Sequence, residues 1–456
     1  MFDVIIRGAT IVSSTAREPA DLAIIGEKVC AVLPPGTTAA ARTQVDATDQ
    51  YILPGLIDTH VHLRDPARPD RETFESGTAA AAAGGITTIF EMPTSEPPVN
   101  TGERLTKRAE IVATRAIVDF ALYGGAGPEN LHEIPKMAKA GAIAFKTWLH
   151  APVAERKNEF FGLCCPNKAD LPAVMLAVAN TGLRHAMHCE DEETLRSAAQ
   201  KIGDSISPAG IVHALSRPIA AEDIAVKRVL EIAHRLNARV QIVHLSSPSA
   251  ARMVENARKQ GVDATIEVCP HYLILNEQTL REYGPFAKCN PPLRSESTVE
   301  ELWLCIQDGL VDVIGSDHCA FLPEELAAGS SDISASPPGL PGLETMLPIL
   351  LTATHDGMLR LEDVVRLTSQ RAAELFGLKT KGSLLPGFDA DFVIIDPTEN
   401  WRYQSEHTFS KAGANARYFE GRQFTGRIKQ TWVRGRQVFD GSKITGVPGF
   451  GRHITP

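Results

Sequence analysis

Long apolar runs, basic tracts and clusters of glycine or proline are all missing from this sequence of 456 residues. No stretch approaches the ~18 consecutive apolar residues of a membrane-spanning helix, so we expect no membrane contact. Its 46 basic residues against 55 acidic ones give a net charge of −9, which argues against nucleic acid as a partner. Because glycine and proline are scattered, no disordered or collagen-like tract is indicated.

Paired cysteine motifs are also missing. The eight cysteines form no C-x-x-C pair, which excludes zinc ribbons and thioredoxin-like redox motifs. We expect reduced thiols packed as small apolar side chains, and therefore a reducing compartment. Near the N-terminus an acid, Asp3, stands where a signal peptide needs basic charge, and Arg7 ends the apolar run. These features predict a cytoplasmic protein.

Both ends of the sequence carry short β-type runs separated by turn signals. Chain ends frequently meet at the surface of a domain. We therefore predict one small β-sandwich domain that is built from residues 1–53 and residues 379–456. It would flank a central domain of residues 54–378. The runs that support this division are residues 3–12, 21–32, 43–52, 391–395 and 428–439.

The central segment alternates short apolar runs with helical stretches, which is the pattern of βαβ units and a parallel sheet. Eight candidate strands match the count of an α/β fold of the (β/α)₈, TIM-like barrel type. The alternative, an open doubly wound sheet, normally has a glycine-rich phosphate turn after its first strand, where this sequence has histidines. The predicted barrel strands are residues 55–62, 86–92, 118–124, 142–148, 184–189, 238–245, 264–269 and 311–317.

Histidines and an acid fall at the C-terminal ends of these predicted strands, where barrels carry their functional residues. His60 and His62 end the first strand, and their spacing points both rings to one face. His188 ends the fifth strand, His244 the sixth and Asp317 the eighth. A single histidine of this kind is more often a hydrogen-bonded core residue, but the whole set indicates a metal site. Histidine and carboxylate ligands suit zinc, with iron, manganese or cobalt as substitutes.

Lys146 lies in the fourth predicted strand, where a buried ammonium is costly. Three roles are open to it. It can form a Schiff base, extend to solvent, or react with CO₂ to give a carbamate whose oxygens bridge two metals. The histidine cluster favours the carbamate, because a Schiff-base lysine needs no metal whereas two cations need a bridging anion.

The motifs at these strand ends resemble the cyclic amidohydrolases of the amidohydrolase superfamily, namely hydantoinases and dihydropyrimidinases, allantoinases and dihydroorotases. This resemblance implies a barrel with a small β domain, a two-metal site and a carboxylated lysine. It also implies hydrolysis of a cyclic amide or imide by a hydroxide held between the metals. It extends over nearly the whole chain, through residues 54–62, 144–146, 188–190, 243–247, 269–272, 290–294, 315–318, 339–344 and 386–391.

The resemblance assigns two divalent ions, with Zn²⁺ expected, and a small cyclic amide as substrate. One ion would be held by His60 and His62 and the other by His188 and His244. The carboxylated Lys146 would bridge the ions, and Asp317 would be both a ligand and the catalytic base. The substrate contacts implied in the same way are Arg64, Asn290, Gly339 and Leu340. We also expect a homo-oligomer, either a dimer or a tetramer.

The motifs do not all point to the same branch of the family. Arg64 matches dihydroorotases, in which this arginine holds a substrate carboxylate, but Thr94 and Phe321 stand where those enzymes have asparagine and histidine. Residues 145–148 and 118–125 are closer to hydantoinases and allantoinases. We therefore expect neutral rings, with Arg64 paired to a local acid such as Asp65 or Asp70, and keep dihydroorotase as the alternative. More distant alternatives are a Schiff-base aldolase and a non-catalytic dihydropyrimidinase-like scaffold. The complete ligand set argues against the scaffold.

Overall fold

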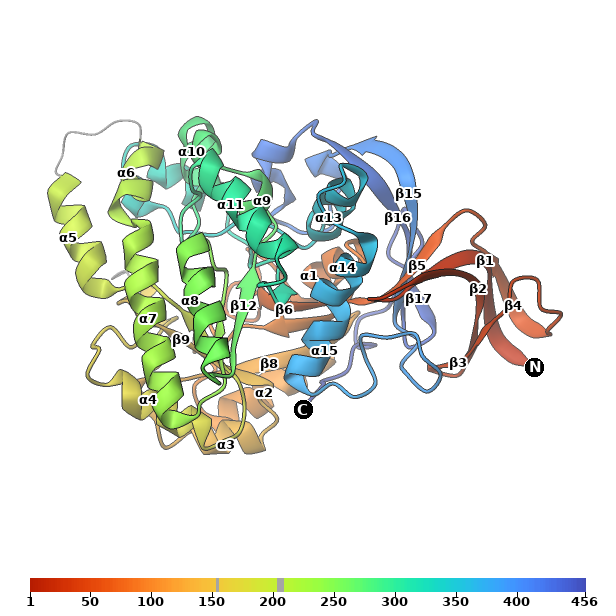
Figure 1. Cartoon of the computed structure of the whole chain (residues 1–456), viewed down its shortest axis with the longest axis horizontal. Helices are drawn as coiled ribbons and strands as arrows, with labels where there is room; N and C mark the ends of the chain where they lie inside the picture. Colours follow the sequence, from red (N-terminus) through yellow and green to blue (C-terminus); the bar gives the residue numbers. More distant parts are fainter. Residues whose placement is uncertain (153–155, 203–208) are drawn as a thin grey trace.

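The computed structural model of the chain describes residues 1–152, 156–202 and 209–456. A curled sheet of parallel strands, wrapped by helices, lies on one side, and a mixed sheet lies on the other (Figure 1). Within the described residues, no helix is both long enough and apolar enough to cross a membrane.

Parallel strands follow one another around the barrel in chain order. Their residues are buried, because helices cover the outer face of the sheet and side chains fill its interior. Seven of the eight strand positions are Leu56–His62 (β6), Ile86–Glu91 (β7), Asp119–Gly125 (β8), Ala144–Trp148 (β9), His185–His188 (β10), Val240–Ile242 (β11) and Ala264–Val268 (β12).

The last strand position is divided into two short pieces. Val313–Ile314 (β13) pairs with β12, and His318–Cys319 (β14) pairs with β6, so hydrogen bonding returns to the first strand. Asp317 lies between the two pieces with a φ of 48°, a left-handed value that interrupts the extended backbone. The TIM-like barrel prediction is confirmed, and the open doubly wound alternative is wrong.

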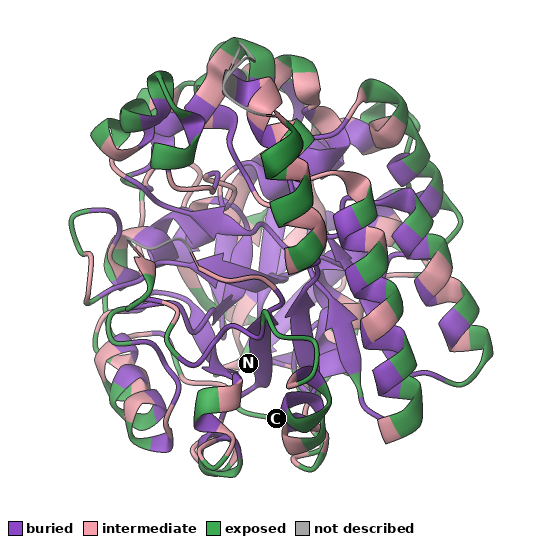
Figure 2. Cartoon of the chain, turned by 90° about the vertical axis from the view of Figure 1, so that its left-hand side faces the viewer, coloured by how far each residue is buried: buried purple, intermediate pink, exposed green. Residues whose placement is uncertain are grey.

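Helices cover the outside of the barrel, with buried residues facing the strands and exposed residues facing outward (Figure 2). Hydroxyl caps start several of them: the side chain of Thr73 accepts the N–H of Ser76, and that of Ser247 accepts the N–H of Ala250. The helices are Phe74–Ala83 (α1), Gly102–Ala113 (α2), Ile134–Lys139 (α3), Leu171–Ala179 (α4), Glu192–Ile202 (α5), Ala209–Ser216 (α6), Ile219–Leu236 (α7), Pro248–Lys259 (α8), His271–Ile274 (α9), Glu277–Tyr283 (α10), Glu296–Gln307 (α11), Pro323–Ala327 (α12), Met346–His355 (α13), Leu361–Val365 (α14) and Arg371–Phe376 (α15).

The two chain ends together form the mixed sheet, in which hydrogen bonds join eight strands. The order is β17-β16-β15-β5-β1-β2-β3, with β4 beside β1. Pairing of β5 with β15, which sets Ile52 opposite Ile394, connects the N-terminal strands to the C-terminal ones. A small β unit built from both ends is therefore confirmed. The strands are Phe2–Val12 (β1), Arg17–Ile25 (β2), Lys28–Leu33 (β3), Ala41–Asp46 (β4), Tyr51–Pro54 (β5), Phe392–Arg402 (β15), Gln423–Val433 (β16) and Arg436–Phe439 (β17).

Candidate metal centre at the barrel mouth

The C-terminal ends of the barrel strands bring the predicted histidines together. The ring of His60 lies 5.3 Å from that of His62 on the same strand and 5.3 Å from that of His244, measured between centroids. His188, which ends β10, lies 4.5 Å from His244 in the same measure. All four rings are buried, so the mouth holds a compact group of imidazoles.

His60, His62 and Asp317 form one part of this group, with one donor atom from each lying within 4.8 Å of the others. Nε2 of His60 is 3.2 Å and Nε2 of His62 is 3.4 Å from Oδ1 of Asp317. The buried Nε2 of His60 makes no hydrogen bond with any described residue. Two imidazole nitrogens and a carboxylate oxygen at these distances, with the His60 nitrogen lacking a hydrogen-bond partner, form a donor set that fits a divalent cation.

Hydrogen bonds from behind orient these two histidines. Nδ1 of His60 lies 2.6 Å from Oε1 of Glu267, and Nδ1 of His62 lies 2.7 Å from Oγ1 of Thr94. Glu267, on β12, also accepts hydrogen bonds from the Thr59 hydroxyl and the Gln241 amide. Bonds of this kind fix the ring and leave Nε2 as the donor toward a metal. Glu267 was not predicted from the sequence, where its signal is an acid inside an apolar strand.

A second candidate group consists of His150, His188 and Glu190. Nε2 of His188 lies 2.6 Å from Oε2 of Glu190, and Arg217 also contacts this carboxylate. The sequence indicated His244 as the partner of His188, and their rings are neighbours, but Glu190 was not predicted as part of this group. Glu190 supports His188 in the way that Glu267 supports His60.

Lys146 enters the mouth from β9 and is fully buried. Its Nζ has no hydrogen-bond partner within residues 1–152, 156–202 and 209–456, and it lies 4.8 Å from the centroid of the Trp148 ring. Burial lowers the pKa of the Lys146 ammonium to about 8. This orphaned amine, which loses its proton readily, fits the chemistry of a carbamate, because CO₂ reacts with the neutral form.

The electrostatics of the mouth favour neutral imidazoles. Burial lowers the pKa of His188 to about 3, and it lowers the pKa values of His62 and His244 well below the ordinary range. Neutral imidazole is the form that binds a metal. Burial also raises the pKa of Asp317, against the opposing effect of His60 and Lys146. The mouth thus combines neutral nitrogen donors with few carboxylates, as zinc sites do.

Two of the predicted substrate contacts, Gly339 and Leu340, lie beside the divided last strand. Leu340 bridges to His318 of β14, and its carbonyl accepts the N–H of Cys319 at 2.9 Å. The N–H of Gly339 donates to the carbonyl of Lys288 at 2.8 Å. Oδ1 of Asn290 is buried and has no hydrogen-bond partner in the described part of the chain. Their roles toward substrate stay predictions.

Arg64 is also at the mouth, and it is buried. It forms an ion pair at 3.3 Å with Glu159, which is 95 residues further along the chain. The two neighbours that we named as partners from the sequence, Asp65 and Asp70, pair with other arginines. The pairing with an acid is therefore as expected, but the acid is supplied by the segment after β9.

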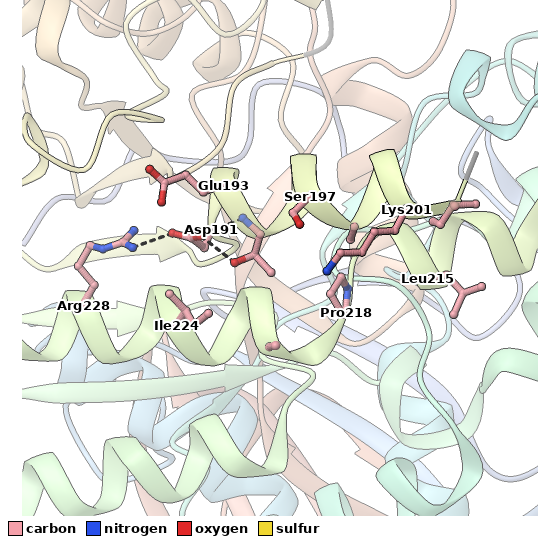
Figure 3. Close-up of a pocket in the computed structure, with 12 residues that line it drawn as sticks. Asp191, Glu193, Ser197, Lys201, Leu215, Pro218, Ile224 and Arg228 are labelled. Carbon is pink, nitrogen blue, oxygen red and sulfur yellow. Dashed lines mark hydrogen bonds and ion pairs between the residues drawn. The ribbon is translucent and has the colours of Figure 1, made fainter. Parts of the chain in front are cut away.

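A cavity of about 780 Å³ lies elsewhere, among α5, α6 and α7 (Figure 3). An ion pair of 2.7 Å between Asp191 and Arg228 crosses one part of it, and Leu215 and Ile224 provide apolar lining. The lining of this described cavity includes none of the strand-end histidines. We therefore place the candidate site at the barrel mouth, because the histidines and Asp317 lie there and not in this cavity.

Comparison with known proteins places these features in a family context. The model of the amidohydrolase family matches residues 51–438. An allantoinase from Streptomyces avermitilis is 34% identical over 445 residues, which cover 97% of each chain. A dihydroorotase from Methanothermobacter thermautotrophicus is 32% identical and covers 91% of this chain and 89% of its own. The solved structure of an L-hydantoinase (dihydropyrimidinase) from Arthrobacter aurescens has a TM-score of 0.94 at 32% identity over 100% of both chains.

Proposed function

Because the chain belongs to the amidohydrolase family, we propose that it hydrolyses a C–N bond of a cyclic amide or imide. The observation that carries this proposal is the meeting of His60, His62 and Asp317 within 4.8 Å, in a mouth where the buried Nζ of Lys146 has no partner among the described residues. Relatives named allantoinase, dihydroorotase and L-hydantoinase support the same class of reaction.

Two divalent ions, with zinc preferred, would be held by residues that all come from strand ends. Bound there, divalent ions supply Lewis acidity, which lowers the pKa of water toward ~7 and polarises a carbonyl. The Lys146 ammonium would lose one proton to give the neutral amine, and this amine would add to CO₂ with loss of a second proton, so that an anionic carbamate replaces a buried ammonium. The ligand set of the proposal is His60, His62, His188, His244, carboxylated Lys146 and Asp317.

Asp317 is the general base of the proposed reaction. Burial raises the pKa of its carboxyl, which lets the group accept a proton more readily than an exposed aspartate does. It takes a proton from the attacking water and transfers it to the ring nitrogen as the C–N bond breaks. Asn290 and the Gly339–Leu340 segment would hold the ring while this transfer occurs.

A hydrolysis panel on metal-loaded protein tests the proposal. The panel contains hydantoin, 5-substituted hydantoins of both hands, dihydrouracil, allantoin, dihydroorotate and succinimide, with a chelated sample as control. We expect ring opening that is lost on chelation and restored by divalent metal. Protein that contains two ions per chain and opens none of these rings contradicts the proposal. A clear preference for dihydroorotate over the uncharged rings would instead favour the dihydroorotase alternative.

A further inference from the structure

The residue that follows the proposed general base has side-chain contacts of its own. His318 comes directly after Asp317, begins β14 and is fully buried. Its Nδ1 accepts the N–H of Gly342 at 3.1 Å. A ring nitrogen that accepts a hydrogen bond carries no hydrogen, so the hydrogen of this imidazole is on Nε2. His318 therefore presents a buried donor at Nε2.

This donor faces a carboxylate that is equally buried. Nε2 of His318 lies 3.6 Å from Oε2 of Glu72, and it has no hydrogen-bond partner in residues 1–152, 156–202 and 209–456. Glu72 belongs to the segment between β6 and α1. Burial alone would raise the pKa of its carboxyl, but the contacts with His318 and with two hydroxyl groups lower this pKa overall. A charged carboxylate thus stands opposite the ring N–H.

A segment from the C-terminal part of the chain fixes this carboxylate. The hydroxyl of Ser410 donates to Oε2 of Glu72 at 2.5 Å, across 338 residues of sequence. The N–H of Lys411 and the hydroxyl of Ser76 donate to Oε1. Ser410 and Lys411 lie between β15 and β16 of the mixed sheet. Glu72 therefore connects the unit formed by the chain ends to the mouth of the barrel.

The backbone at Asp317 is of a kind that needs support from its neighbours. Its φ of 48° is left-handed, and a residue other than glycine keeps such a conformation only where its surroundings hold it. On one side, the N–H of Ser316 donates to Asp58 at 2.9 Å. On the other side, the N–H of His318 donates to the Ser316 hydroxyl at 3.0 Å. Held between them, Asp317 has its Oδ1 3.2 Å from Nε2 of His60.

Building on the proposed function, we propose that His318 and Glu72 are positioning residues for Asp317. Gly342 occupies Nδ1 of His318 and Glu72 faces its Nε2, so this ring acts on the base through the backbone and not as a metal ligand. Without the carboxylate of Glu72, the His318 ring is no longer fixed and the left-handed turn relaxes. The base is then still present, but its carboxylate is displaced from the two histidines.

Binding of Co²⁺ tests the proposal without catalysis. Glu72→Gln keeps the size of the side chain and removes its charge. We expect it to weaken Co²⁺ binding about 10-fold in chelator competition, as for residues that orient a ligand, and to change the visible absorption of the bound ion. In the Asp317→Asn chain the same substitution should have no further effect, because the group through which it acts is gone. An equal effect in both chains, or no effect in either, overturns the proposal.

Turnover of metal-loaded protein gives a second readout. Glu72→Gln and His318→Asn should each lower kcat about 10-fold and leave KM within about 2-fold, since the loss falls on the base and not on substrate binding. Substitutions that act through one contact are not additive, so the double variant should be no slower than the slower single variant. Additive losses, or a loss confined to KM, contradict the positioning role.

Two further variants separate positioning from a general loosening of the mouth. Glu344→Gln changes an acid that binds the backbone of Phe409 and Ser410 but does not contact His318, and it should leave kcat unchanged. His318→Gln restores a donor toward Glu72, which His318→Asn is too short to do, and should recover part of kcat. If Glu72→Gln does not fold by circular dichroism, His318→Asn replaces it in the Co²⁺ comparison. An equal loss of kcat in Glu344→Gln contradicts the inference.

Failure of the proposed function gives a different result. If metal-loaded protein opens no ring of the hydrolysis panel, the hydrolytic assignment is wrong. The Co²⁺ measurements still decide the present inference, because an effect of Glu72→Gln that depends on Asp317 supports it, and the absence of such an effect overturns it.

Discussion

Glu267 and His60 are joined by a contact of 2.6 Å between Oε1 and Nδ1, although 207 residues separate them in the sequence. The two residues come from β12 and β6, so the contact spans strands that are not neighbours in the sheet. Both side chains are fully buried. The position of one proposed metal ligand therefore depends on an acid from β12, which the divided last strand separates from β6.

The first prediction concerns this contact. Glu267→Gln should lower the affinity for divalent metal about 10- to 100-fold, because the ring of His60 loses its charged acceptor. Chelator competition measures the affinity, and circular dichroism checks the fold. Glu255→Gln, which changes an acid of α8 paired with Lys259, is the matched control. Unchanged metal affinity in Glu267→Gln would show that this acid does not orient the ligand.

The second prediction concerns Lys146. Lys146→Ala should lose metal and activity together, because the bridging anion can no longer form. Acetate or propionate should restore part of both by occupying the space that the lysine leaves. Metal analysis and turnover of hydantoin are the measurements, with Lys136→Ala, at an exposed lysine that pairs with Glu133, as the control. Normal metal content together with normal turnover would exclude the carbamate.

The third prediction separates proton transfer from metal binding. Asp317→Asn should keep most of its metal and lower kcat about 10²- to 10⁴-fold, since an amide cannot carry the proton. Turnover is compared at equal metal content, with Asp308→Asn, at an exposed ion pair with Arg252, as the control. A metal-loaded Asp317→Asn protein with a nearly normal kcat would remove this residue from the catalytic role.

The fourth prediction concerns pH and stability. Burial raises the pKa of Glu91 to about 7, against two backbone N–H groups and Arg108. The pKa of this carboxyl in the unfolded chain is about 4.5. Between about pH 4.5 and about pH 7, the folded chain therefore holds up to one proton more than the unfolded chain. The contribution of Glu91 to the free energy of unfolding falls as pH rises through this window, by roughly 3 kcal/mol, and is constant above it.

Glu91→Gln tests this pH dependence, because glutamine does not titrate. It keeps only one of the two acceptor oxygens that the N–H groups of Leu63 and Arg64 use, and the cost of that loss is the same at every pH. The difference in thermal midpoint between variant and natural protein should grow in favour of the variant from pH 5 to pH 7. Parallel curves for the two proteins over this range would mean that Glu91 ionises in the folded state as it does in the unfolded chain.

Local patterns were sufficient to predict most of the fold. Each barrel strand is a short apolar run, and each cap or turn between runs is encoded by neighbouring residues, so β6 to β12 appear where the periodicity places them. The interruption of the last strand was not predicted, because it depends on the left-handed backbone of Asp317, for which hydrophobic periodicity carries no signal.

The proposed ligands were predicted for a related reason: a barrel brings all its strand ends to one mouth, whatever their distance in sequence. The residues that hold these ligands in position were not predicted from the sequence. Glu267 reaches His60, and Glu190 reaches His188, through side-chain contacts that depend on the packed interior. The position of Arg156 was missed for the same reason, since only the folded chain brings Arg156 and Arg64 to the ring of Phe321.

The pairing of β5 with β15 has a consequence for biosynthesis. β5 is made early, but its partner, which sets Ile394 opposite Ile52, is made only after the whole barrel. At roughly 5–20 residues per second, the ribosome needs tens of seconds to close this gap. Throughout that time an apolar strand edge, of the kind that recruits other chains, has no partner. Pairing with β15 thus covers an apolar strand edge that is otherwise open to other chains.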